Sequence, residues 1–331
     1  MSDLKKFSAF WGNNHLLTQG AGGNTSKKYN GLMDVKASGT WLADASKKNI
    51  FTTLNLKKTK LIIDKDQDSF DEAIISNSEL KQKPSIETSF HALLSNKIVV
   101  HLHPINLLAL LVLKNAYQLL KTNMKDLHFI FISYYKPGLF LAKKILNETS
   151  RKRANIIFLQ NHGIIITGDS FVKINENLNL VLKKNNMPSR PFNHNLLKKK
   201  DIDTSKINMR FPKYDIVNSL AFDEISYEIC KNKKNIFYPD QIVYLGKKIF
   251  CVESIDEMNA VLILNPLFIV FKNVGVFVAN FAKSDVDELL RGHAELLLKL
   301  NSNDQLNPLN DKDILEIENW DSEKYRQTVV R

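Results

Sequence analysis

The sequence is poor in cysteine, with only Cys230 and Cys251 among its 331 residues. The two lie far apart and in no metal-binding spacing, which argues against a disulfide framework and favours a reducing compartment. Long apolar runs are also missing: the longest, 107–113, is far shorter than the roughly 20 residues of a membrane-spanning helix. Because the N-terminus carries no apolar signal segment either, we expect a cytoplasmic protein without a membrane partner.

Arginine is scarce, although the net charge is +11: it supplies 7 of the 46 basic residues. The lysines are spread along the chain, with dense runs only at 198–200 and 231–234, and neither run is interleaved with aromatic residues. Nucleic-acid-binding surfaces usually combine basic runs with stacking aromatic rings. We therefore predict no nucleic-acid partner, a solvated lysine surface, and some steering of anionic, phosphorylated substrates.

The remaining composition, 44% apolar and 24% charged, is that of an ordinary globular protein with one large domain or two smaller ones. Apolar periodicity predicts helices over 3–18, 85–94, 105–120, 139–148 and 170–184. It predicts strands over 32–36, 41–42, 60–63, 97–103, 129–132, 156–159, 164–166, 241–245, 249–252 and 267–271. A stretch rich in proline, lysine and asparagine then divides the chain into a core over 1–185, a linker over 186–235 and a C-terminal region over 236–331.

Three histidines lie at the ends of predicted strands. His101 and His103 are separated by one residue on a strand, so their side chains point to the same face. His162 follows another apolar strand at a turn. Three imidazoles with an open fourth position suit a catalytic divalent metal such as zinc, although ordinary histidines at a strand end are the competing interpretation.

A carboxylate, Glu87, precedes the first of these histidines. Ser85 is predicted to cap a helix that continues to Leu94, with Glu87 near its start. A carboxylate beside a metal can act as a general acid or base. The alternative is that Glu87 only stabilises the first helical turn through the helix dipole.

Two glycine-containing turns, 20–26 and 38–40, offer backbone N–H groups together with amide and hydroxyl donors. The first is not a Walker A motif, because no Gly-Lys-Ser/Thr follows, and it is not a Rossmann fingerprint, because Thr25 stands at the third glycine position. Turns of this kind can hold a small phosphate. Two of them ahead of a metal site favour a phosphorylated small molecule over a nucleotide, with plain glycine turns as the alternative.

Residues 156–166 align without gaps with 268–278, at an offset of 112 residues (268 minus 156). Each copy is followed by an acidic helix start and an amphipathic helix. Val274 stands in the position of His162, so a second copy would lack this metal ligand. The C-terminal region is therefore a possible degenerate repeat of the core, unless the match is a generic strand-Asn-x-Gly-strand hairpin.

Five motifs resemble, in this order, the class II aldolase/adducin superfamily: GGNTS (22–26), KASGT (36–40), SIET (85–88), HLHP (101–104) and NHG (161–163). Segments 134–138, 238–241 and 316–320 resemble the aldolase part of bifunctional rhamnulose-1-phosphate aldolase/short-chain dehydrogenase proteins, with the dehydrogenase part absent here. The resemblance implies a three-layer α/β/α sandwich around a mainly antiparallel sheet. It also implies a homo-oligomer, usually a tetramer with active sites at subunit interfaces.

The resemblance also assigns roles by motif position. The ligands of Zn2+, or of another divalent metal, would be His101, His103 and His162, with Glu87 as the acid/base. The substrate phosphate would be held by Asn24, Thr25, Ser38 and Gly39. The proton-donating tyrosine of the family has no matching motif here, and the candidates are Tyr117, Tyr134 and Tyr135.

We therefore expect a zinc-dependent class II aldolase that cleaves a phosphorylated ketose by a retro-aldol reaction. Zinc would polarise the substrate carbonyl, and Glu87 would move the proton. An epimerase, decarboxylase or dehydratase of a related sugar phosphate is the alternative on the same fold. A non-enzymatic, adducin-like interaction protein would be marked by lost metal ligands, and all three histidines are present.

Overall fold

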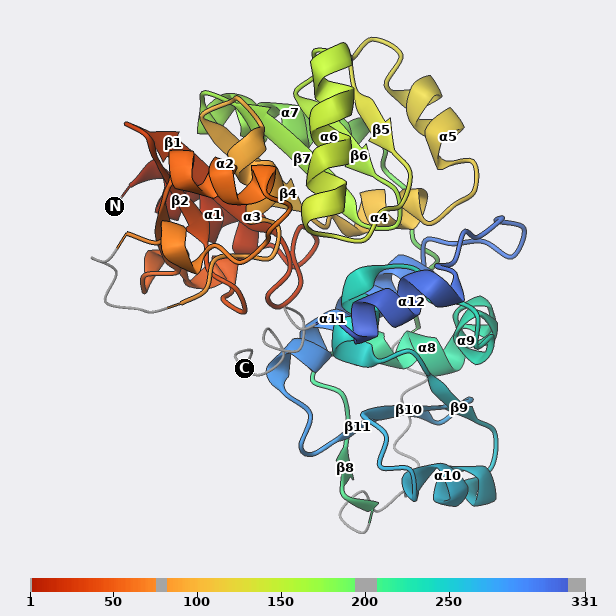
Figure 1. The fold of residues 1–331 in the computed structure, drawn as a ribbon. Coiled ribbons are helices and arrows are strands. Elements are labelled where there is room, and N and C mark those ends of the chain that lie inside the picture. Colours follow the sequence, from red (N-terminus) through yellow and green to blue (C-terminus); the bar gives the residue numbers. More distant parts are fainter. Residues whose placement is uncertain (1, 76–81, 194–206, 321–331) are drawn as a thin grey trace.

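The computed structural model describes residues 2–75, 82–193 and 207–320, so the lysine run at 198–200 lies outside the described residues. A seven-stranded core sheet has the order β3-β2-β1-β4-β7-β6-β5 (Figure 1). Its strands are β1 (Asn24–Tyr29), β2 (Leu32–Lys36), β3 (Phe51–Asn55), β4 (Ile98–Leu102), β5 (Ile130–Ile132), β6 (Ile156–Leu159) and β7 (Gly163–Gly168). Every neighbouring pair is antiparallel except β5 and β6, so the predicted mainly antiparallel sheet is confirmed.

Helices cover both faces of this sheet. One face packs against α2 (Leu56–Asp64), α3 (Thr88–Leu93) and α6 (Leu139–Arg151). The other packs against α1 (Asp3–Gly12), α4 (Ile105–Leu111), α5 (Ala116–Asn123) and α7 (Phe171–Lys184). Alternate residues of β4 divide between the two faces, with Val99 in one apolar cluster and Val100 in the other. The predicted three-layer α/β/α arrangement is confirmed.

Two of the predicted strands are helical. Residues 60–63 belong to α2, because the Asn55 side chain caps the helix at the Lys58 N–H and the buried Thr59, Ile62 and Ile63 follow helical spacing. The predicted strand at 41–42 is the start of a 3₁₀ turn over Leu42–Ser46. β3 has no strand signal in the sequence, because three of its five residues are polar.

Three predicted helices have clearly different limits in the structure. The helix over 105–120 is split into α4 and α5, because the Lys114 N–H donates to the Gln305 carbonyl oxygen in the C-terminal half of the chain. The helix expected from Ser85 begins at Thr88, since the Ser85 hydroxyl accepts from the Glu87 N–H and forms a turn before the helix. A third, predicted to run to residue 18, ends at Gly12.

A second sheet, of four strands, lies in the C-terminal half with the order β8-β11-β10-β9. The elements of this half are β8 (Met209–Arg210), α8 (Ser219–Phe222), α9 (Glu224–Lys231), β9 (Phe250–Val252), α10 (Ile255–Leu262), β10 (Phe268–Phe271), β11 (Gly275–Ala279), α11 (Ser284–Leu297) and α12 (Asp311–Glu318). The predicted strand at 241–245 is instead a buried π-helical turn, since the Gln241 side chain accepts from the Phe237 N–H at its start.

The second sheet repeats the strand arrangement of half the core sheet. β9 is parallel to β10 and β10 antiparallel to β11, as β5 is to β6 and β6 to β7. A helix joins each parallel pair, α6 in the core and α10 in the second sheet. Asn161 and Asn273 have the same left-handed backbone, with φ 58° and 56°. The structure thus contains the strand, turn, strand and helix that the alignment of 156–166 with 268–278 predicts.

Strand register extends this comparison to the metal ligands. Val100 pairs with Ile166 in the core, and Arg210 pairs with Val278, the residue aligned with Ile166. One residue further along each strand, Phe211 therefore stands where His101 stands in the core. Phe211 lies 110 residues after His101, and the residue 110 after His103 is Lys213. Val274 aligns with His162 by the offset of 112 residues. None of the three positions in the second sheet that match a metal ligand of the core is a histidine. The domain boundaries at 185 and 235 stay a prediction.

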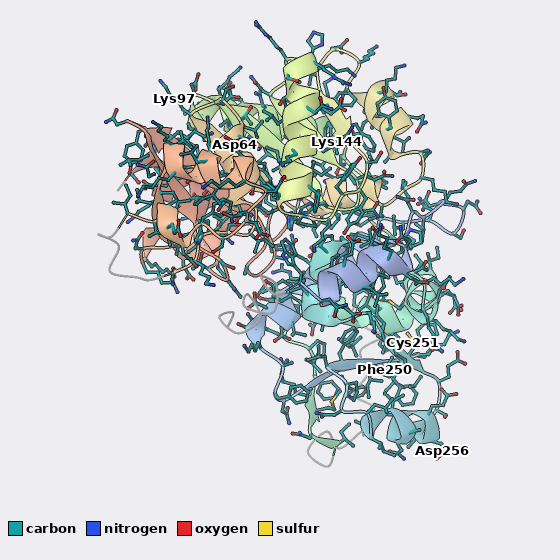
Figure 2. The ribbon with its side chains drawn as sticks, viewed as in Figure 1. Asp64, Lys97, Lys144, Phe250, Cys251 and Asp256 are labelled. Atoms are coloured by element: carbon teal, nitrogen blue, oxygen red, sulfur yellow. The ribbon has the colours of Figure 1, made fainter. Side chains whose placement is uncertain are left out.

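The two sheets are joined by an apolar cluster that includes residues of α4, α8, α11 and the turn at 241–245, and the helices α8, α9, α11 and α12 lie between the sheets (Figure 1). Charged side chains such as those of Lys97 and Asp256 are exposed on the outside (Figure 2). No helix in the described ranges is both long and apolar enough to cross a membrane.

Candidate active site

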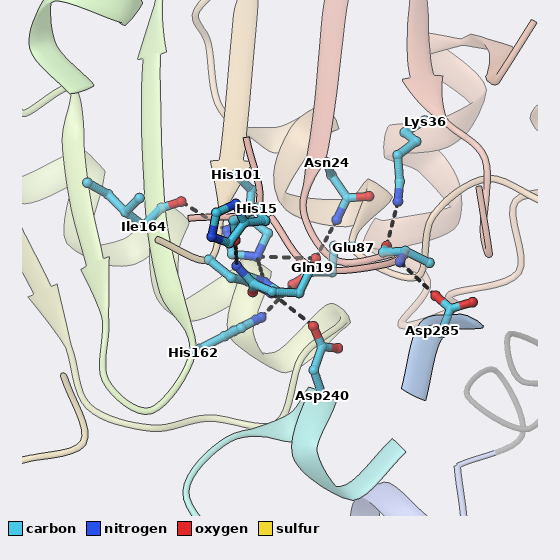
Figure 3. A network of polar contacts seen from close by, with 12 residues as sticks. His15, Gln19, Asn24, Lys36, Glu87, His101, His162, Ile164, Asp240 and Asp285 are labelled. Atoms are coloured by element: carbon cyan, nitrogen blue, oxygen red, sulfur yellow. Dashed lines mark hydrogen bonds and ion pairs between the residues drawn. The ribbon is translucent and has the colours of Figure 1, made fainter. Parts of the chain in front are cut away.

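Three histidines converge at one end of the core sheet, and Figure 3 labels two of them, His101 and His162. His101 lies on β4, His103 follows the end of that strand, and His162 lies in the turn between β6 and β7. Their ring nitrogens lie within 4.8 Å of one another, and all three residues are buried. The structure therefore brings together the three residues that the sequence pattern predicts as metal ligands.

The turn that carries His162 is fixed by its two neighbours. The left-handed Asn161 donates its side-chain amide to the carbonyl oxygens of Phe237 (2.8 Å) and Asn307 (2.7 Å). A Cβ atom at Gly163 would lie 2.4 Å from the last carbonyl oxygen of β4. Only glycine therefore allows the turn to approach the strand that carries the other histidines.

A hydrogen bond indicates the proton position on His101, and a close carboxylate contact bears on that of His103. Nδ1 of His101 lies 3.0 Å from the Ile164 carbonyl oxygen, which can only accept, so the proton is on Nδ1 and Nε2 carries a lone pair. Burial, together with the neighbouring His103 and His162, holds the pKa of His101 well below its usual value, so this ring is neutral at pH 7. Nδ1 of His103 lies 2.9 Å from Oδ2 of Asp240, which favours the same tautomer there.

This donor set fits a divalent metal. The Nε2 atoms of His101 and His103 lie 2.9 Å apart. The lone pair on Nε2 of His101 is available to a hydrogen on Nε2 of His103 or, in its place, to a cation shared by the two rings. Neutral imidazole nitrogens are typical zinc donors, and three protein donors leave one position for substrate. The three histidines are therefore suited to hold a catalytic ion.

The Glu87 carboxylate lies against two of the histidines. Its oxygens are 3.5 Å from Nε2 of His101 and 3.4 Å from Nε2 of His162, and the Asn24 amide donates to it over 2.5 Å. Glu87 occupies the N-cap position of α3, yet its side chain makes no capping hydrogen bond. Its contacts are with the histidine cluster rather than with the helix, unlike those expected if it only stabilised the first turn.

A small pocket opens beside this cluster. Six of the predicted site residues line it: Asn24, Ser38, Gly39, Glu87, His103 and His162. The Ser38 hydroxyl faces no hydrogen-bond partner in the described part of the chain, so it is available to a ligand. Thr25 is placed differently, because its buried hydroxyl lies 2.7 Å from that of Ser8 and it is not among the residues that line the pocket.

The sequence interpretation missed two charged residues of the pocket wall, Lys36 and Asp240. The Lys36 ammonium is buried and donates to the carbonyl oxygens of Ala21 and Thr40, both over 2.7 Å. A lysine directly before the Ala-Ser-Gly turn, on an otherwise buried strand, was a usable signal. Asp240 had none, because it comes from the C-terminal half and meets His103 only in the folded chain.

The predicted proton-donating tyrosines lie outside the set that lines the pocket. Tyr117 is 44% exposed and packs on Phe131, and Tyr135 is 41% exposed. The Tyr134 hydroxyl has no hydrogen-bond partner among the described residues, and burial raises its pKa. This role stays without an assigned residue.

The sequence matches the family model described as class II aldolase and adducin N-terminal domain over residues 9–181. An uncharacterized oxidoreductase of Bacillus subtilis (strain 168), YuxG, is 29% identical over 174 residues, which cover 48% of this chain and only 25% of that protein. The N-terminal class II aldolase domain of a conserved protein from Thermoplasma acidophilum shares 23% identity with a TM-score of 0.48, covering 55% of this chain and 92% of that one. A sugar-phosphate aldolase from Thermotoga maritima shares 16% identity with a TM-score of 0.41, covering 55% and 90%.

Proposed function

Because the chain belongs to the class II aldolase and adducin family, we propose that it is a zinc-dependent lyase that cleaves a phosphorylated ketose by a retro-aldol reaction. The observation that carries this proposal is the position of Glu87, whose carboxylate lies within 3.5 Å of two of three clustered histidines at the pocket wall. A metal site and an acid–base group next to one another are what breaking a bond beside a carbonyl requires.

His101, His103 and His162 would hold the ion. When bound, a divalent ion supplies Lewis-acid stabilisation of the negative charge that develops on the substrate oxygens. Glu87 handles the proton at C3. As the C3–C4 bond of the ketose breaks, a C4 carbonyl forms and the electron pair of the broken bond passes to the C2–C3 unit. The acid form of Glu87 then gives its hydrogen to C3, and the carboxylate takes a proton from solvent before the next turnover. Asn24 orients this carboxylate by donating to one of its oxygens. The proton of the C4 hydroxyl leaves to a base that has no assigned residue.

Other residues of the pocket wall support binding of a phosphate group. The Ser38 hydroxyl and the left-handed Gly39 form a turn at the wall, and the buried Lys36 adds a positive charge beside them. Hydroxyl and backbone donors next to a cation are suited to a phosphate dianion. The proposal therefore places the phosphate at this turn and the reacting carbons toward Glu87.

A panel of ketose 1-phosphates tests the proposal. The zinc-loaded protein is incubated with each sugar, and the released aldehyde is trapped as a hydrazone and identified. We expect at least one sugar to be cleaved, and cleavage to stop when the ion is removed with a chelator. A changed configuration of the intact sugar would instead identify an epimerase, and loss of water or carbon dioxide a dehydratase or decarboxylase.

The matched control is the His103→Ala protein, which keeps Glu87 and the phosphate turn. It should release no aldehyde and should bind little zinc, because three protein ligands leave no redundancy. A wild-type protein that binds no metal and turns over no member of the panel would contradict the proposal and favour a non-enzymatic role.

A further inference from the structure

The C-terminal half of the chain contributes one carboxylate to the histidine cluster. Oδ2 of Asp240 lies 2.9 Å from Nδ1 of His103, and both residues are buried, with 5% and 6% exposed. Asp240 lies beyond residues 9–181, which match the aldolase family model. The contact therefore joins the histidine cluster to a part of the chain outside that match.

Three hydrogen bonds fix the backbone around Asp240. The Phe237 carbonyl oxygen accepts from Asn161, which immediately precedes His162, so the two segments are tied together. The Phe237 N–H donates to the Gln241 side chain over 2.9 Å. The Tyr238 hydroxyl lies 3.0 Å from Nδ1 of the buried His293. The position of Asp240 is thus fixed by packing and hydrogen bonds, not by its ion pair alone.

The loop that contains Gly22 packs directly against Asp240 and His103. A Cβ atom at Gly22 would lie 2.9 Å from Oδ2 of Asp240 and 3.1 Å from Nδ1 of His103. No larger residue fits there without displacing one partner, so the loop, the carboxylate and the imidazole form one close-packed unit. A buried carboxylate in a rigid setting of this kind restricts the orientation of the ring it contacts.

We propose that Asp240 is the positioning residue for His103, so that the C-terminal half completes the metal site of the core within the same chain. This inference rests on the metal site of the proposed function. When Nε2 of His103 binds an ion, its ring proton is on Nδ1, and the Asp240 carboxylate 2.9 Å away would hold the ring in that tautomer and orientation. Carboxylates in this position also raise the basicity of the ligand, and removing them typically weakens metal binding about 10–100-fold.

Zinc affinity of the purified 331-residue chain tests the proposal without any assay of turnover. Dissociation constants are measured by competition with a chromophoric chelator for wild type, Asp240→Asn and Asp287→Asn. Asp287 is the matched control, because it is also 5% exposed and pairs with Arg210 over 2.7 Å, but it does not contact the histidines. We expect the Kd for zinc to rise about 10–100-fold in Asp240→Asn and to stay within about twofold in Asp287→Asn.

Two further readouts separate positioning from general stabilisation. The visible spectrum of the cobalt(II)-substituted protein reports ligand geometry, and it should change in Asp240→Asn but not in Asp287→Asn. Asp240→Glu keeps a carboxylate and should bind zinc more tightly than Asp240→Asn, even if both unfold at a lower temperature. A lower melting temperature with unchanged zinc affinity in Asp240→Asn would show a structural role only.

The outcomes also distinguish this inference from the proposed function. Wild-type zinc binding with equal affinity in Asp240→Asn would overturn the role of Asp240 and leave the aldolase proposal intact. A wild-type protein without zinc affinity would overturn both. A rise in Kd of similar size in Asp287→Asn would also refute the inference, since the effect would then belong to any buried carboxylate of this half.

Discussion

Replacing Glu87 by glutamine distinguishes a catalytic role from a purely structural one, because the two roles predict changes in turnover of very different size. Glutamine keeps the length of the side chain and an oxygen that can accept from Asn24, but it cannot carry a proton to carbon. Loss of a general acid or base lowers turnover by about 10²–10⁴-fold, which corresponds to about 3–5 kcal/mol in activation free energy. A carboxylate that only stabilises the first turn of α3 contributes about 0.3–1 kcal/mol to stability and nothing to the rate.

The structure favours the larger effect. The Glu87 side chain makes no capping bond in α3, and its oxygens lie 3.4 and 3.5 Å from two histidine nitrogens. Because glutamine removes no histidine, zinc content should stay close to that of the wild type. We therefore expect a much lower kcat with nearly normal zinc content and a similar melting temperature.

The assay measures kcat on the ketose 1-phosphate that the wild type cleaves fastest, together with zinc content and thermal unfolding. Glu224→Gln is the control, because Glu224 lies in the first turn of α9 and its side chain is 68% exposed, away from the pocket. It should change neither kcat nor zinc content. Unchanged turnover of Glu87→Gln with a slightly lower melting temperature would refute the catalytic role.

Three further predictions follow from other contacts. His162→Ala should lose most of the single zinc ion expected per chain, and stoichiometric metal by mass spectrometry would argue against this ligand. Asn161→Ala should lower the free energy of unfolding, measured in urea, by about 2–4 kcal/mol more than Asn273→Ala. The reason is that the Asn161 side chain donates hydrogen bonds to two carbonyl oxygens. Equal losses in the two variants would count against these bonds. Burial lowers the pKa of Lys28 to about 7 from 10.5, so the unfolded state binds more protons between these pH values and stability should rise with pH across that window. Unfolding curves of Lys28→Met should lack this rise, and an unchanged slope would contradict the shift.

The regular parts of the fold were predictable because their local signals agree with their environment. The run before His101 is apolar on both faces and lies at the centre of the sheet, and α7 covers 171–184, close to the predicted 170–184. The wrong predictions lie where a short apolar run fits both helical and strand periodicity, as at 60–63, or where contacts between residues far apart in the sequence determine the secondary structure. The break between α4 and α5 depends on a bond from Lys114 to Gln305 that no local pattern contains.

The candidate site shows the same limit. His101, His103, His162 and Glu87 stand at strand and helix ends, so alternation and motif order were enough to nominate them. Asp240 could not be found in this way, because it is brought to His103 by the packing of the C-terminal half. The tetramer, the cytoplasmic location and the sugar stay predictions, since they depend on groups outside this single chain.

Exchange of a carbon-bound hydrogen of dihydroxyacetone phosphate for solvent deuterium tests most directly the claim that Glu87 moves a proton at C3. Every ketose 1-phosphate cleaved between C3 and C4 yields this compound, so the test does not depend on which sugar is the substrate. The zinc-loaded protein is incubated with it in D2O, and the C3 hydrogens are followed by proton NMR. We predict loss of one C3 hydrogen signal with the wild type and no loss with Glu87→Gln or the metal-stripped protein. No exchange by a wild type that carries one zinc ion per chain, or equal exchange by Glu87→Gln, would contradict the account.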